Sequence, residues 1–159
     1  MSRPHPVRAV RVSAPSTVRA DVDLPGAGYR AAYEVRVPPG LTAEGWARHT
    51  FERAPWAIRT FVRFGWRFVL GLRLVSDGSS PQIAGWTLGS RTDDAVTMTT
   101  TSRWLTAEKI TRIEGDLLVV STSVRFEKTL GRLLWAAVVP VHHLTEPLLL
   151  TSAVRRPAG

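Results

Sequence analysis

His142 and Glu146 are the residues whose types and spacing best fit acid–base or metal chemistry. They stand four positions apart in a segment with helical periodicity, so their side chains share one helical face. That spacing serves two metal ligands or an acid–base pair. A metal site needs a third ligand, and polar side chains that follow a proline, here Pro140, commonly satisfy the backbone carbonyls that it leaves free. Both interpretations stay open, and we assign no catalytic residue, no metal ligand and no cofactor. His49 has no partner pattern and is expected at the surface.

Arginines form a second group with possible binding chemistry. Three of them fall in segments patterned as half-buried strands, at Arg103, Arg112 and Arg125. Pointing inward, such a residue would hold an anionic head group with its planar guanidinium, whereas simple alternation points it into water. Three others recur every fourth position in a predicted helix, at Arg59, Arg63 and Arg67. We interpret these as a solvated face, with contact to a membrane surface or an acidic partner as the lesser alternative.

Large aromatic side chains could form the walls of a ligand cavity. They are Trp46, Trp56, Phe61, Trp66, Trp86, Trp104 and Trp135. Any one of them could equally fill a core, but six tryptophans in a small domain supply wide, rigid walls. Trp86 on a strand and Trp135 on the last helix are the preferred pair.

Composition limits the class of protein. A chain of 159 residues suits one domain, and its 44% hydrophobic and 21% charged residues are ordinary for a globular protein. Cysteine is absent, which excludes a disulfide framework and agrees with a cytoplasmic location. The N-terminus lacks the apolar segment of a secretory signal. The longest apolar run, residues 133–141, is shorter than the ~20 residues that span a bilayer, so we expect no transmembrane segment.

The net charge of +8 does not indicate a nucleic-acid partner. The basic residues are 19 arginines and 2 lysines, a bias that a GC-rich coding sequence produces together with frequent alanine, glycine and valine. They are dispersed instead of clustered with exposed aromatics, so we expect weak duplex DNA binding without sequence preference. We expect a monomer or homodimer.

Periodicity predicts an α+β fold. Alternation predicts strands over residues 31–37, 83–91, 95–104, 105–113 and 117–126, a short one near residues 7–12, and a return to the sheet at 72–75. The last four long strands are linked too closely for crossover helices, so they are antiparallel. Helices are expected after Thr42, after Pro55 and over residues 129–153. The glycines of the sequence GAGYRA (residues 26–31) precede a strand, so we interpret this G-x-G-x-x-A match as a turn.

The helices are expected to bury their apolar faces. The inner stripe of the second helix should consist of Ile58, Phe61, Val62, Gly65 and Val69. The terminal helix is apolar nearly all round, so both its sides should be covered, and Pro140 should bend it over a curved sheet. We divide the chain into a flexible segment (1–28), one domain (29–154) and a disordered tail (155–159).

This order of elements resembles the helix-grip fold of the START-like (SRPBCC) superfamily, which includes polyketide cyclases and lipid-transfer domains. The chain is most similar to a bacterial family of unknown function, DUF2867, at residues 84–86 (Ala-Gly-Trp), at the hairpin of residues 112–116, and at residues 130–132 and 140–142 of the last helix. The resemblance covers about residues 30–153. It implies a curved antiparallel sheet wrapped around a long C-terminal helix, with a cavity between them.

We therefore expect the domain to bind a small apolar or amphipathic molecule between sheet and last helix. The residues expected at this cavity are Trp86, Trp104, Arg112, Trp135, Val138 and His142. An enzyme of cyclase or dehydratase type using the same cavity is the alternative. A third interpretation is an accessory partner of an oxidoreductase, docked through the arginine-striped helix.

Overall fold

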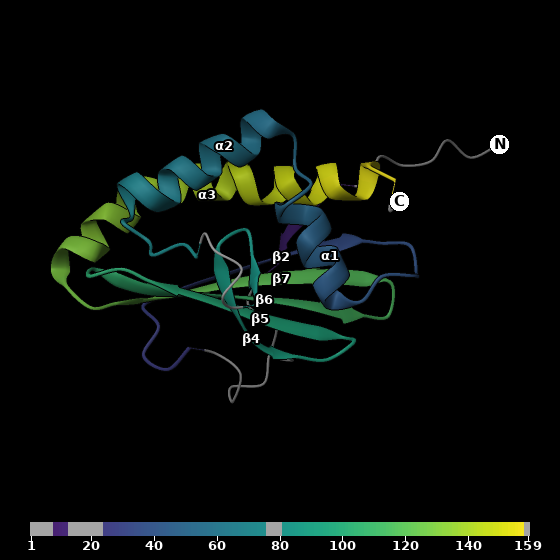
Figure 1. Cartoon of the computed structure of the whole chain (residues 1–159), viewed down its shortest axis with the longest axis horizontal. Helices are drawn as coiled ribbons and strands as arrows, with labels where there is room; N and C mark the ends of the chain where they lie inside the picture. Colours follow the sequence, from purple (N-terminus) through teal and green to yellow (C-terminus); the bar gives the residue numbers. More distant parts are fainter. Residues whose placement is uncertain (1–7, 13–23, 76–80, 158–159) are drawn as a thin grey trace.

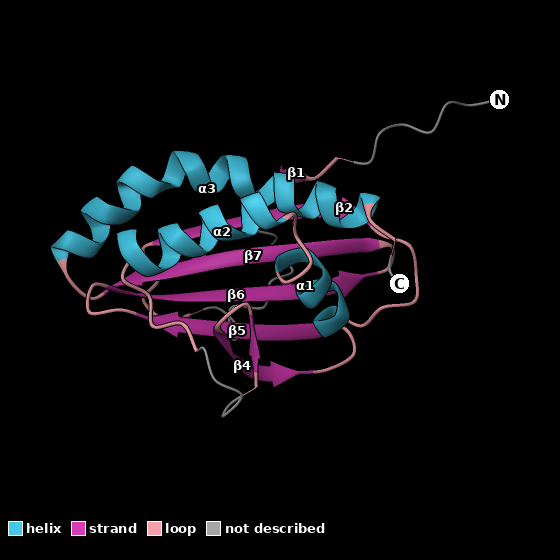
Figure 2. Ribbon diagram, turned by 45° about the horizontal axis from the view of Figure 1, so that its top comes forward, coloured by secondary structure: helices cyan, strands magenta, loops and turns pink. Residues whose placement is uncertain are grey.

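The computed structural model describes residues 8–12, 24–75 and 81–157. The described strands form one open antiparallel sheet in the order β1-β2-β7-β6-β5-β4-β3, and the helices lie on one face of it (Figures 1 and 2). The strands are β1 (Val10–Val12), β2 (Tyr29–Arg36), β3 (Gln82–Ile83), β4 (Trp86–Arg91), β5 (Ala95–Thr101), β6 (Leu105–Glu114) and β7 (Leu117–Phe126). The helices are α1 (Ala43–Phe51), α2 (Trp56–Phe64), its π-helical continuation η1 (Gly65–Val69) and α3 (Thr129–Arg155). The expected α+β architecture, an antiparallel sheet under a long C-terminal helix, is confirmed.

Strand register determines which side chains meet the helices. Tyr33 on β2 pairs with Val120 on β7, which pairs with Thr111 on β6, which in turn pairs with Val96 on β5. All four side chains are buried. Because strand side chains alternate between faces, these pairs identify the inner face of the sheet. The hydrophobic core lies between this face and the helices.

Helix α1 closes one end of the core. Thr42 caps it, its hydroxyl accepting from the amide of Gly45 at 3.1 Å, and Trp46 packs inward as expected. The expectation for His49 was wrong, because this side chain is buried one turn after Trp46. Its Nε2 bonds to the carbonyl oxygen of Ala153 at 2.9 Å, which ties α1 to the end of α3.

The predicted strand over residues 83–91 is two strands. Ala84 (φ 52°) and Gly85 (φ 92°) form a two-residue turn between β3 and β4, with Ile83 paired to Trp86. Positive φ at both central residues gives the turn a twist that matches a β-hairpin. Residues 72–75 form no regular strand, although the amide of Val75 bonds to the carbonyl oxygen of Gly85 at 2.7 Å. Strand β5 ends at Thr101, earlier than predicted.

Helix α2 does not bury the predicted stripe. Ile58 and Val62 are half-buried, but Phe61 is 57% and Val69 40% exposed. Figures 1 and 2 show α2 beside α3, above the sheet. Ile58 and Val62 therefore pack against the edge of the core, whereas Phe61 and Val69 line a cavity beside α3 and are exposed to solvent.

Helix α3 continues through Pro140 and Pro147 without a break, and Figure 2 shows it arched over the sheet. The expectation that both its sides are covered was wrong. An apolar stripe along its outer side is exposed, including Leu133 (62%) and Leu144 (73%). By length and composition alone, α3 is long and apolar enough to cross a membrane, but the core helices of soluble proteins also meet these two criteria. In its most apolar window, 28% is buried inside the structure.

Strand β1 lies within the segment predicted to be flexible and pairs with β2, Val10 opposite Glu34. The rest of that prediction, at residues 1–7 and 13–23, and the tail residues 158–159 lie outside the described residues.

Candidate functional site

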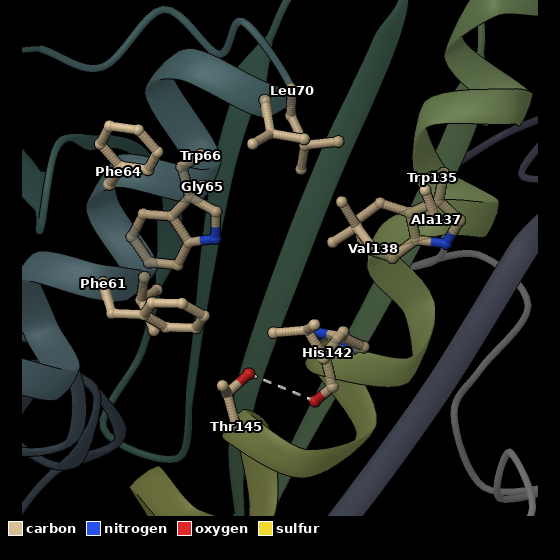
Figure 3. Close-up of a pocket in the computed structure, with 13 residues that line it drawn as sticks. Phe61, Phe64, Gly65, Trp66, Leu70, Trp135, Ala137, Val138, His142 and Thr145 are labelled. Atoms are coloured by element: carbon tan, nitrogen blue, oxygen red, sulfur yellow. Dashed lines mark hydrogen bonds between the residues drawn. The ribbon is translucent and has the colours of Figure 1, made fainter.

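A cavity of about 320 Å³ lies between α2–η1 and α3 (Figure 3). The residues that line it are Phe61, Val62, Phe64, Gly65, Trp66, Val69, Leu70, Trp135, Ala137, Val138, Val141, His142 and Thr145. None of them belongs to the sheet, so this cavity does not lie at the expected location, between sheet and terminal helix. The inner face of the sheet packs directly against helix side chains. The cavity opens between α2–η1 and α3, which run side by side without close packing of their side chains at this point.

The π-helical turn η1 shapes one wall of the cavity. The amide of Leu70 donates to the carbonyl oxygen of Gly65, five residues back, at 3.0 Å. This wide turn places Gly65, Trp66 and Val69 at the cavity. Trp66 packs edge-on against Trp86, with ring centroids 5.3 Å apart, so it separates the cavity from the core. Single π-turns inserted in α-helices are frequent at functional sites.

His142 is the titratable side chain in the cavity wall. It is 8% exposed and packs against the rings of Trp135 and Tyr29, at centroid distances of 5.4 and 6.0 Å. Burial lowers its pKa to about 4, although the Glu146 carboxylate acts in the opposite direction, so the imidazole is neutral at neutral pH. Nδ1 lies 3.8 Å from Oε2 of Glu146, a contact with a neutral ring and not an ion pair. Nε2 has no hydrogen-bond partner among the described residues.

A buried ion pair lies behind His142. Lys109 Nζ donates to Oε1 of Glu146 at 2.7 Å and to Oγ1 of Thr122 at 2.9 Å. The two charged side chains are 3% and 4% exposed. Burial is the largest single effect and raises the pKa of Glu146, but the charge and hydrogen bond of Lys109, together with His142, outweigh it and hold that pKa below its ordinary value. The carboxylate is therefore ionised, and the hydrogen bond to it is charge-assisted.

Sequence reasoning did not find Lys109. On β6 it occupies an inner-face position together with Leu105 and Ala107, and Met98 on β5 is its cross-strand partner. The alternation that predicted the strand also places this lysine inside, and that was the available signal. Rings of Phe51 and Trp86 lie 5.4 and 5.8 Å from its ammonium group.

His143 forms a second polar group on the side of α3 that faces β2. The Tyr33 hydroxyl lies 2.8 Å from Nδ1, and the Tyr29 hydroxyl lies 3.2 Å from Nε2. Burial lowers the pKa of His143, with a smaller contribution from Arg11. Burial also raises the pKa of Tyr29 to about 12. The two tyrosines therefore hold a neutral imidazole and fix the position of α3 over β2.

The structure brings together three of the residues predicted for the cavity. Trp135, Val138 and His142 line it. The other three lie elsewhere. Trp86 is buried behind Trp66. Trp104 lies in the turn after β5, beside the first turn of α3, where Gly131 approaches its carbonyl group.

Arg112 lies on the outer face of the sheet, opposite Val119, because it is an odd number of positions from Lys109. Arg125 also points outward and pairs with Glu127 at 2.9 Å, and Arg103 lies in a turn with its guanidinium over Trp104. The suggestion that one of these arginines points inward was wrong. The described residues contain no group of three side chains suited to hold a metal ion.

Comparison with known proteins gives a family. The chain matches the family model described as "Protein of unknown function (DUF2867)" over residues 24–147. A search of curated proteins and a search of solved structures found no match. The matched region contains strands β2 to β7, the cavity and the Lys109–Glu146 pair. Because the match covers most of the chain, the protein belongs to the DUF2867 family, as its sequence resemblance indicated.

Proposed function

We propose that this protein binds a small amphipathic molecule in the cavity between α2–η1 and α3, as a ligand-binding member of the START-like superfamily. The walls support this proposal, since they are almost entirely apolar and aromatic. The volume, about 320 Å³, is that of a pocket for a small organic molecule.

The observation that carries the proposal is the unpartnered Nε2 of His142. A buried polar atom without a partner costs about 1–3 kcal/mol, so such atoms call for a ligand or another explanation. With Nδ1 facing the ionised Glu146, the proton resides on Nδ1 and Nε2 is left as an acceptor. A ligand hydroxyl group would donate to it. Figure 3 shows the indole nitrogen of Trp66 on the side that faces α3, where its N–H would meet the same ligand.

A cyclase or dehydratase is the second candidate. His142 on the cavity wall, with Glu146 behind it, has the arrangement of a base and the group that orients it. However, an imidazole with a pKa of about 4 is a weak base at neutral pH. Lys109 and Glu146 neutralise one another and leave neither free for proton transfer. We therefore place binding ahead of catalysis.

A pair of probes tests the binding proposal. 1-Naphthol and naphthalene have similar apolar bodies, and only the first has a hydroxyl group. We expect 1-naphthol to quench or shift tryptophan fluorescence and to raise the melting temperature, and naphthalene to bind more weakly. His142→Phe should remove the preference for the hydroxyl and keep the apolar part of the binding.

Val138→Trp and Leu144→Ala are the matched variants. The first should fill the cavity and abolish binding, and the second, at a 73% exposed position outside the cavity lining, should not change it. Native mass spectrometry of the freshly purified protein should show a retained small molecule that Val138→Trp loses. If each probe bound the Val138→Trp variant as tightly as it binds the unmodified protein, the proposal would be refuted.

A further inference from the structure

Aromatic side chains project from α2–η1 into solvent. Trp56 is 74% exposed, Phe64 58% and Phe68 67%, and the rings of Phe64 and Phe68 touch, with centroids 4.9 Å apart. Scattered exposed apolar residues are ordinary, but a contiguous patch of them marks an interaction site. This patch adjoins the cavity, since Phe61 and Phe64 belong to its lining.

Helix α3 extends the same apolar surface. Its exposed stripe recurs every third or fourth position, at Leu133, Ala137, Val141, Leu144 and Leu148. Ala137 and Val141 also line the cavity opposite Phe61, so the stripe and the aromatic patch meet at the cavity. We call these exposed residues of α2–η1 and α3 the docking face.

Positive charge accompanies the docking face. Arg59, Arg63 and Arg67 follow one another at every turn of α2–η1 and are exposed. Among the described residues, Arg63 and Arg67 have no carboxylate partner. They line a shallow hollow of about 280 Å³ together with Phe64 and Phe68, and the Arg67 guanidinium lies 5.9 Å from the Phe68 ring. The sequence from residue 53 to residue 76 contains no Asp or Glu.

These charges determine the class of partner. A second copy of the chain would bring arginines against arginines, and the net charge of +8 opposes that pairing further. Aromatic rings beside arginines, with no acidic residue between them, are typical of helices that lie in the interface of an anionic bilayer. We propose that the docking face binds the surface of an anionic membrane, with its aromatic rings at the level of the lipid headgroups and its arginines on lipid phosphates.

The protein binds as a peripheral unit in this proposal, and α3 does not cross the bilayer. The contacts that hold α3 on the domain include Gly131 against the Trp104 carbonyl, the buried Lys109–Glu146 pair, and the bond from His49 to Ala153. Crossing would break these contacts and expose an ionised glutamate to hydrocarbon. The inference does not depend on the proposed ligand.

Vesicle sedimentation tests the inference. Vesicles of phosphatidylcholine with added phosphatidylglycerol should sediment the protein, pure phosphatidylcholine should not, and added salt should weaken the binding. The fluorescence of exposed tryptophan should shift to the blue on binding. Failure to sediment with the anionic vesicles overturns the proposal and leaves an acidic protein as the partner of this surface. Equal binding to both kinds of vesicle overturns it as well, because the arginines would then have no part in the contact.

Variants locate the contact. Phe64→Ser with Phe68→Ser, and separately Arg63→Glu with Arg67→Glu, should each weaken vesicle binding by about tenfold or more, with an unchanged melting temperature because the side chains are exposed. Arg155→Glu, at an exposed position at the end of α3, is the charge control and should bind almost as the unmodified protein does. Unchanged binding by either double variant overturns the proposal.

A further variant separates this proposal from the ligand proposal. Val138→Trp, which fills the cavity, should still bind vesicles, so failure of the ligand proposal and failure of the membrane proposal are distinguishable.

Discussion

Lys109 in the middle of the sheet and Glu146 in α3 form a buried ion pair, with Nζ 2.7 Å from Oε1. The contact joins a central strand to the helix that arches over it. Each charge has lost its water, so each depends on the other for compensation.

Removing one member of this pair should be far more costly than removing both. Lys109→Met alone leaves an uncompensated buried carboxylate, and we expect it to lower the free energy of unfolding by ~3–5 kcal/mol. Lys109→Met combined with Glu146→Leu should restore much of that loss. Urea denaturation of the two single variants and the double variant, as a double-mutant cycle, measures the coupling. Additive losses would show that the two groups do not interact.

Stability should fall as the solution is acidified. The pKa of His142 is about 4 in the folded protein and 6.5 in the unfolded chain, so between these values only the unfolded chain binds the proton. Stability present above pH 6.5 is thus lost as the pH falls towards 4, by on the order of 3 kcal/mol. The lowered pKa values of His143 and Glu146 act in the same direction, the glutamate below pH 4.5.

Urea denaturation at a series of pH values measures this slope. His142→Phe should flatten the decline between pH 6.5 and 4 and leave the loss at lower pH. An unchanged slope in that variant would show that other groups govern the acid response.

Gly131 should tolerate no side chain. A Cβ at this position would lie 2.2 Å from the carbonyl oxygen of Trp104, which cannot move away without distorting the turn before β6. Gly131→Ala should therefore destabilise the protein strongly, by a few kcal/mol, as expected for overpacking. Gly65→Ala is the matched control, because open space surrounds that position and alanine favours helix by up to ~1 kcal/mol. Thermal unfolding of both variants compares them directly, and equal melting temperatures would contradict the close approach.

The two sides of α3 should respond differently to truncation. Leu150 is fully buried, so Leu150→Ala should cost ~2–5 kcal/mol through lost contacts and the resulting void. Leu144 is 73% exposed, and Leu144→Ala should stay within about 0.5 kcal/mol. Chemical denaturation gives both values. A large loss at Leu144 would mean that its side of the helix is covered in solution, by a second copy or another partner.

Local patterns predicted the secondary structure well where one face of an element is buried. On β7 the alternation predicted a more apolar face of Leu118, Val120, Thr122, Val124 and Phe126, and the first four are buried and the last half-buried. Val119 and Ser123 on the other face are buried as well. The cap at Thr42 and the opening of α2 after Pro55 also depend only on neighbouring residues.

The site was less predictable because it depends on contacts between distant segments. Lysine in a strand ordinarily points to solvent, and no local signal reveals that Glu146 compensates Lys109 across 37 positions of the sequence. Periodicity predicted which residues of α2 form its inner stripe, but it cannot say how closely that stripe packs against its neighbours. In the structure a cavity lies between α2–η1 and α3, and Phe61 lines it.

The strand order has a consequence for the order of folding. Strands β3 to β7 follow one another along the sheet, so each pairs with a neighbour close in sequence, whereas β2 pairs with β7 from the far end of the domain. Closing that long loop is entropically slow, so adjacent hairpins form first and β2 docks late. Tyr29 and Tyr33 belong to β2, so their hydrogen bonds to His143 on α3 are among the last native contacts to form. A kinetic intermediate of this chain would therefore have a meander of paired strands and an unanchored terminal helix.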